Sequence, residues 1–159
     1  MARRKEQQLP LRVLKKFRLI YGSVRQHFRR VEENCGISGL QLWLLQEIAK
    51  TPGAGVSELA DRLFIHQSTC SQLVEKLAVR RLVLKKRSKE DLRRVGLVLS
   101  ATAKEILQRA PGPAEGILPE ALSALSEDVL TDLDASLSEV TGQLRVRDEK
   151  LSENPLSDL

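Results

Sequence analysis

The sequence predicts a mainly α-helical fold with a small β-hairpin wing, arranged as a winged helix-turn-helix that N- and C-terminal helices flank. Two short helical patterns joined by a tight connection lie between residues 56 and 80. Two apolar strand patterns follow and bracket a polar, basic loop. This order of helix, turn, helix, strand, loop and strand is the one that a winged helix-turn-helix requires. Toward both ends of the chain, apolar residues alternate spacings of three and four, which is typical of helix–helix contacts.

The composition of the 159-residue chain is that of one ordinary globular domain. Hydrophobic residues make up 42% and charged residues 30%. Aromatic residues, at 3%, are too few to favour binding of single-stranded nucleic acid by stacking. No apolar run approaches the roughly 20 residues that cross a bilayer, and the N-terminus lacks the apolar segment of a secretory signal. We therefore expect a cytoplasmic protein with no membrane partner.

Charge is segregated along the chain. Residues 1–30 hold ten Lys or Arg and one Glu, and residues 76–94 hold nine Lys or Arg and two acids. Residues 115–139 hold seven acids and no base. Scattered charge would serve solubility alone, whereas this segregation predicts one surface that meets a polyanion and another that stays away from it.

The first segment, residues 1–36, combines a basic arm with a long helix. The arm is expected to end at Pro10, and the helix follows from Leu11. Its apolar stripe is narrow, as at a seam between two helices, so we expect a dimerisation helix. Asn34 and Gly36 end it. The stripe is formed by Leu14, Phe17, Tyr21, Val24, Phe28 and Val31.

The second helix has clear start and stop signals. Ser38 and Gln41 have the spacing of a capping box, and Pro52 with Gly53 ends the helix. We interpret the ring of Trp43 as part of the core rather than as the wall of a ligand pocket. The buried face is predicted to consist of Leu40, Leu44, Leu45 and Ile48.

The third and fourth helices complete the helix-turn-helix. The third is expected from Ser57 to Leu63, with Ser57 as its cap, and the fourth from Gln67 to Arg80. The core face of the fourth helix is Cys70, Leu73, Val74 and Leu77. Its other faces carry short polar and amide side chains, which can hydrogen-bond base edges or phosphates, whereas a face built for solubility would hold more Glu and Lys. The predicted DNA-binding residues of this recognition helix are Gln67, Ser68, Thr69, Ser71, Gln72 and Lys76.

The wing closes the predicted DNA-binding domain, residues 37–100. Two strands, Leu82–Lys86 and Val95–Leu99, enclose a basic loop. Arginines at a hairpin tip suit the minor groove, where negative potential is concentrated. The predicted DNA-binding residues of the wing are Arg87, Asp91, Arg93 and Arg94. Because phosphate would repel Asp91, its expected role is to hold an arginine in its working rotamer.

Four segments carry a family resemblance over roughly residues 36–140. They are ISGLQLWLL on the second helix, VSELADRL on the third, STCSQLVEKL on the recognition helix and RSKEDLRRVGLVLS at the wing. Together they resemble the MarR family of bacterial transcriptional regulators. The resemblance implies a homodimer made by the terminal helices, with two winged modules that read the halves of a pseudo-palindrome in double-stranded DNA. By position, it makes Arg93 the minor-groove residue of the wing and Asp91 its holder.

Three residues depart from the family pattern, and one of them is Ala103, which stands where a glycine often follows the second strand. Phe64 stands in the turn between the third and fourth helices, where many relatives have glycine, and a bulky residue there predicts a different local backbone. Arg81 stands where a glycine often precedes the first strand. None of the three positions carries a proposed DNA contact, so the departures concern the turns and not the fold.

The last segment, residues 101–159, is predicted to supply the C-terminal dimerisation helices and a tail. A helix after Ser100 is interrupted at Pro111, and Pro119 marks a further break. The final helix opens at Ser126 and carries a second narrow seam. That seam is Leu130, Leu133, Leu137, Val140 and Leu144. Two seams that flank a DNA-binding module favour a symmetric homodimer over the packing of two helices of one chain.

The resemblance also implies an effector, because relatives commonly respond to small aromatic or phenolic acids bound between the dimer helices and the winged module, or to cysteine oxidation. The candidate redox residues are Cys35 and Cys70. Cys70 lies on the core face of the recognition helix, where an adduct would disturb it, but a small buried hydrophobe is the favoured interpretation. Cys35 is expected to be exposed, with no adjacent Lys or Arg. His27 and His66 are isolated and are interpreted as surface or turn residues, not metal ligands.

The sequence therefore predicts a DNA-binding transcriptional regulator, a repressor that a small molecule or an oxidant releases. The alternative is a winged-helix protein-interaction module without specific DNA binding, and the three arginines of the wing argue against it. An enzyme is disfavoured because the chain shows no glycine-rich phosphate loop, no metal-spaced His or Cys set and no nucleophile with a base. No cofactor is expected.

Overall fold

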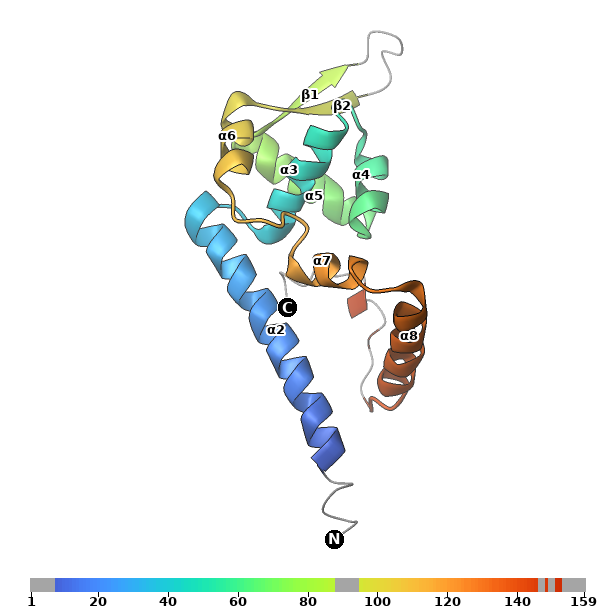
Figure 1. Ribbon diagram of the computed structural model, residues 1–159. Coiled ribbons are helices and arrows are strands. Elements are labelled where there is room, and N and C mark those ends of the chain that lie inside the picture. The colour runs from blue at the N-terminus through green and yellow to red at the C-terminus, as the bar shows by residue number, and fades with distance from the viewer. Residues whose placement is uncertain (1–7, 88–94, 146–147, 149–150, 153–159) are drawn as a thin grey trace.

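The computed structural model describes residues 8–87, 95–145, 148 and 151–152 (Figure 1). The elements follow in the order α2 (Gln8–Cys35), α3 (Gly39–Lys50), α4 (Val56–Leu63), α5 (Gln67–Val79), β1 (Val83–Arg87), β2 (Val95–Leu99), α6 (Ala101–Arg109), α7 (Ile117–Ser123) and α8 (Glu127–Gly142). The predicted fold class is confirmed, since the described chain is mainly helical with one two-stranded antiparallel hairpin.

Local sequence signals determine where helices α2 and α3 begin and end. Helix α2 begins at Gln8, earlier than expected, because Pro10 is tolerated in the first turn of a helix. Gly36 then adopts a left-handed φ of 65° and ends the helix, as predicted. The capping box of α3 is confirmed: the Ser38 hydroxyl accepts from the Gln41 backbone N–H at 3.2 Å, and the Gln41 side chain accepts from the Ser38 N–H at 3.0 Å.

Two boundary predictions are wrong. Helix α4 begins at Val56 behind Gly55, which supplies no side-chain hydrogen bond, so Ser57 is not its cap. Pro119 does not interrupt a helix but lies in the first turn of α7, where its missing N–H loses no hydrogen bond within the helix. In addition, α8 ends at Gly142, so Leu144 lies beyond the helix whose seam it was expected to extend.

The wing is joined to the segment that follows α3. In the hairpin, Val83 pairs with Leu99 and Arg87 with Val95. The Gly53 N–H donates to the Leu97 carbonyl at 2.8 Å, and the Leu97 N–H donates to the carbonyl of Ala54 at 3.0 Å. The root of the wing is thus held in register by backbone bonds to a third segment.

One hydrophobic core lies beneath the helix-turn-helix and the wing. It draws on α2 at one end and on α6 at the other, and α3 is buried between them. The largest side chains with less than 2% exposure are Val31, Leu42, Leu44, Leu45, Ile48, Leu59, Cys70, Val74, Leu77, Val83 and Leu97. Each short helix therefore buries its apolar face in this one core, and the outer faces of α4 and α5 remain exposed to solvent.

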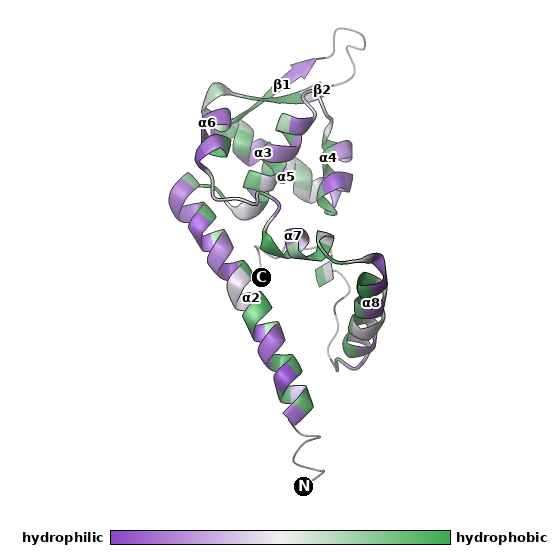
Figure 2. Cartoon of the chain, viewed as in Figure 1, coloured by the Kyte–Doolittle hydropathy of each residue, from purple (hydrophilic) through white to green (hydrophobic). Residues whose placement is uncertain are grey.

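Helices α2 and α8 extend outside this core. In Figure 1, the N-terminal half of α2 runs away from the winged module, and α8 is attached beyond α7. Figure 2 shows that apolar residues recur along both helices in these outlying parts. No helix within the described ranges has the length and apolarity needed to span a membrane.

The packing at the wing root gives a first testable prediction. A Cβ added to Gly96 would lie 2.5 Å from the Gly53 carbonyl oxygen and 2.8 Å from the Gly53 Cα. Because the backbone of Gly53 cannot move away without strain, Gly96→Ala should lower the free energy of unfolding by about 1–3 kcal/mol, measured from urea unfolding curves.

The matched control is Gly22→Ala on α2, since nothing lies within 4 Å of the added methyl group. That change should be neutral or should stabilise by about 1 kcal/mol through helix propensity. Equal unfolding midpoints for Gly96→Ala and the unmodified protein would contradict the described contact between β2 and Gly53.

Candidate nucleic-acid interface and adjoining pocket

Helix α5 presents one face to the core and the other to solvent. Cys70, Val74 and Leu77 are buried, and Leu73 is partly buried. Of the residues predicted to contact DNA, Thr69 is half-buried and the rest are exposed, namely Gln67, Ser68, Ser71, Gln72 and Lys76. Their amide, hydroxyl and ammonium groups are therefore available to a partner along the first three turns of the helix.

The turn before α5 contains an unusual backbone. Phe64 adopts a left-handed conformation with φ 53° and ψ 43°, and its N–H donates to the carbonyls of Ala60 and Asp61. The expectation of a different local backbone is thus wrong: the conformation that suits glycine is retained, and the phenylalanine adopts it at a cost of roughly 1–2 kcal/mol. Arg81 does the same before β1, with φ 56°.

Ion pairs and hydrogen bonds fix the helix-turn-helix on its neighbours. The Arg62 guanidinium donates to the Thr51 hydroxyl at 2.6 Å and to the Glu58 carboxylate at 2.7 Å. At the other end, the guanidinium of Arg80 donates to the Gly36 carbonyl at 2.7 Å. The last contact ties the end of α5 to the junction between α2 and α3.

The root of the wing is basic and exposed. Lys85, Lys86 and Arg87 lie on β1 with exposed side chains. Lys85 pairs with Glu75 of α5, so the wing and the recognition helix are linked directly. The other predicted wing residues, Asp91, Arg93 and Arg94, lie outside the described residues. Where the chain is described, the wing root and the exposed face of α5 together carry more cationic than anionic groups.

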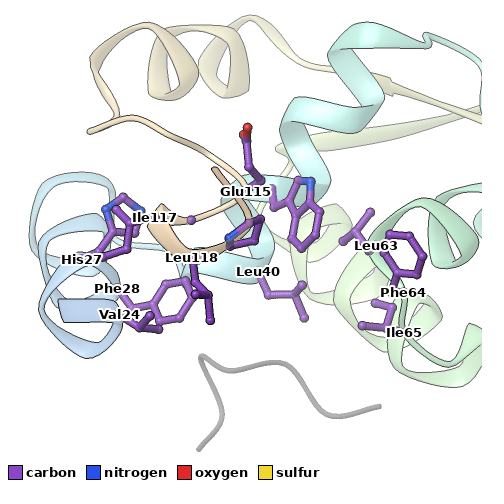
Figure 3. Close-up of a pocket in the computed structure, with 14 residues that line it drawn as sticks. Val24, His27, Phe28, Leu40, Leu63, Phe64, Ile65, Glu115, Ile117 and Leu118 are labelled. Carbon is purple, nitrogen blue, oxygen red and sulfur yellow. The ribbon is translucent and has the colours of Figure 1, made fainter. Parts of the chain in front are cut away.

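An apolar pocket of about 180 Å³ lies on the other side of the helix-turn-helix turn (Figure 3). In the close-up, Val24, Phe28 and Leu118 stand on one side and Leu63, Phe64 and Ile65 on the other, with Leu40 between them. The remaining lining residues are His27, Gly39, Trp43, Glu115, Gly116, Ile117 and Pro119. The pocket therefore joins α2, α3, α7 and the turn that leads into α5.

Two sequence interpretations are corrected at this pocket. Trp43 is only partly buried and lines the pocket as well as packing on the core. His27 is not a surface residue, because it is only 8% exposed and Nε2 has no hydrogen-bond partner. Burial lowers its pKa, against the opposing effect of a hydrogen bond to the Pro113 backbone. His66, in contrast, lies in the turn as expected, at the N-cap of α5.

Neither cysteine has the environment of a reactive thiol. Cys35 is 6% exposed, so the expectation that it is exposed is wrong; the C-terminal end of α2 packs into the core. Burial raises its pKa, although Arg109 acts in the opposite direction. Burial also raises the pKa of Cys70 to about 11. No group of three or more His, Cys, Asp or Glu residues suited to a metal ion occurs within the described residues.

An exposed polar helix beside a basic hairpin, on this order of elements, defines the winged helix-turn-helix class of DNA-binding proteins. Residues 36–94 match the model of the MarR family. This match covers the helix-turn-helix and the wing, and together with the fold it supports a DNA-binding transcriptional regulator similar to that family. Transcription regulators of this family are not enzymes.

Several solved structures share the fold. The complex of S. aureus MepR with DNA is 20% identical, with 81% of this chain and 94% of that chain covered and a TM-score of 0.55. BldR from Sulfolobus solfataricus is 26% identical, with coverage of 85% and 96% and a TM-score of 0.52. YusO from Bacillus subtilis is 18% identical, with coverage of 91% and 99% and a TM-score of 0.52. A comparison with curated protein sequences gives no match.

The buried thiols give a second prediction. Because a pKa of about 11 in place of 9.0 leaves about a hundredfold less thiolate at neutral pH, Cys70 should react with iodoacetamide far more slowly in the native protein than in urea. Intact-mass spectrometry over time measures the reaction, and the urea-unfolded protein is the control. Rapid addition of one label to the native protein, mapped to Cys35 or Cys70, would show that the described burial of that residue is wrong.

Proposed function

We propose that the protein is a cytoplasmic repressor that binds a pseudo-palindromic operator as a homodimer and is released by a small-molecule effector. The observation that carries this proposal is the exposed polar face of α5 beside the basic root of the wing. Amide and hydroxyl groups on a helix can read base edges, and cations beside them neutralise phosphates. Repression follows simply, because a dimer that covers two half-sites excludes other proteins from that DNA.

The dimer is proposed from apolar surface that the single chain leaves uncovered. On α2, the stripe that is buried at Val24 and Val31 continues outward through residues that are 40% to 57% exposed, among them Leu9, Val13 and Phe17. On α8, Val129, Leu137 and Val140 are exposed as well. Patches of this kind, on helices that project from the core, favour a symmetric partner. Two-fold symmetry would place the two recognition helices about 34 Å apart, one turn of DNA.

The effector is proposed to occupy the pocket of Figure 3, as the family resemblance implies. The pocket is bounded by the helix that carries the dimer stripe and by the turn that positions α5. A small aromatic or phenolic ligand bound there would therefore contact both the proposed dimer helix and the turn before α5. Release by an oxidant has less support, because both thiols are buried and have raised pKa values.

Selection from random duplex DNA at two salt concentrations tests the proposal. A dimeric regulator should enrich an inverted repeat with half-sites about one turn apart, and its affinity should fall steeply as salt rises. Retention without an enriched sequence would indicate nonspecific basic binding. No retention at either salt concentration would contradict the proposal and favour a winged-helix protein-interaction module.

A third prediction separates the helix from the wing. Gln72→Ala should change the preferred base at one position of each half-site, at a cost of about 1–3 kcal/mol for the original base. Arg93→Ala should weaken binding to all sequences alike and reduce the salt dependence, as expected for a contact to minor groove or phosphate. Binding curves with operator variants at several salt concentrations measure both effects.

The control is Arg109→Ala, an exposed basic residue at the end of α6. This variant should bind the operator like the unmodified protein. Unchanged binding by the Arg93 variant would rule out the proposed wing contact. Unchanged base preference in the Gln72 variant would rule out the proposed base contact.

A further inference from the structure

Phe64 is conspicuous for both its backbone and its exposure. Its side chain is 84% exposed, although it adopts a left-handed conformation that a bulky residue rarely takes. It adds nothing to the core, and it lies three residues before the start of α5. Its ring nevertheless forms one wall of the pocket, so the exposed aromatic face is available to whatever occupies that space.

The pocket gathers aromatic residues that are scarce elsewhere. The chain holds three Phe, one Trp and one Tyr, and Phe28, Trp43 and Phe64 all line this pocket. A cavity of about 150 Å³ lined by apolar groups accommodates benzene, so the pocket of about 180 Å³ has room for one aromatic ring with a short substituent. Aromatic walls favour such a ring through offset or edge-to-face contacts.

The polar groups at the pocket are mainly acceptors. Glu115 lies at the rim, and in Figure 3 its carboxylate is directed away from the apolar side chains. His27 lacks a hydrogen-bond partner at Nε2, and burial lowers the pKa of its ring. Apart from the His27 N–H that bonds the Pro113 backbone, Trp43 contributes the one side-chain donor among the described lining residues, which include no Lys, Arg, Ser or Thr. A carboxylate buried here would lose its hydration without a cation in exchange.

From these observations we propose that the pocket takes a one-ring aromatic compound that is uncharged or cationic, and discriminates against the anionic aromatic acids to which relatives commonly respond. The ring packs against Phe64, and a positive substituent extends out to the rim of the pocket, where Glu115 lies. Phe64 is thereby the residue through which an occupant changes the turn before α5. This inference specifies the effector class of the proposed repressor and so rests on that function, although its test requires no DNA.

The test uses the fluorescence of Trp43, the chain's only tryptophan and a wall of the pocket. Benzylamine, benzyl alcohol and benzoate form a matched series with a cationic, a neutral and an anionic substituent at neutral pH. Benzylamine and benzyl alcohol should bind, and benzoate should bind at least about tenfold more weakly than benzylamine. Equal or tighter binding of benzoate, or no response to any of the three compounds, would overturn the proposed ligand class.

The role of Glu115 is tested separately with Glu115→Gln. This change should weaken benzylamine by about threefold to fivefold, as expected for a partly exposed charge pair, and leave the affinity for benzyl alcohol unchanged. The matched control is Glu127→Gln, an exposed acid in the first turn of α8 outside the pocket lining. An equal loss for both ligands would show that Glu115 acts on the shape of the pocket and not on its charge preference.

The role of Phe64 is tested by amide hydrogen exchange across the turn and the first turn of α5. Benzylamine should slow exchange there in the unmodified protein and have little effect in Phe64→Gly, which suits the left-handed backbone but lacks the ring. Val79→Ala, which removes another exposed apolar side chain from the far end of α5, should keep the response. An undiminished response in Phe64→Gly would overturn this role, whether or not the protein binds DNA.

Discussion

The burial of one face of α5 is the constraint on which the rest of the structure depends. Cys70, Val74 and Leu77 are at most 1% exposed, and each side chain of the size of Leu77 contributes about 1.5–3 kcal/mol by leaving water. With that face committed to the core, the amide and hydroxyl side chains of the same helix must face outward. The wing depends on the same core through Val83 and Leu97, so its basic root is held beside the helix.

The secondary structure could be predicted because its signals are local. The capping box at Ser38, the helix end at Gly36 and the strand Val95–Leu99 follow from short-range chemistry, and the structure reproduces each of them. The core face of α5 also follows from spacing alone, and its polar residues are left exposed as expected. Their contact with DNA remains a prediction.

The parts that sequence could not supply depend on contacts between distant segments. Cys35 and His27 were expected to be isolated surface residues. In the structure, Arg109 acts on the pKa of Cys35, and the Pro113 backbone is hydrogen-bonded to His27, so α2 lies beside segments far along the chain. Phe64 was expected to alter its turn, but the hydrogen bonds that end α4 impose the left-handed backbone regardless of the side chain. The family resemblance implied a ligand site between the dimer helices and the winged module, but the residues that line the pocket could not be predicted, since residues between 24 and 119 line it and only the packed fold brings them together.

The proposed dimer holds its two recognition helices about one DNA turn apart, and the spacing of the half-sites tests this most directly. Insertion of about five base pairs between the half-sites of the selected operator moves one of them to the opposite face of the duplex. The account predicts that sedimentation shows two protomers on the original site and that the inserted site loses most of the affinity. Equal affinity for both sites, or one protomer on a complete site, would contradict it.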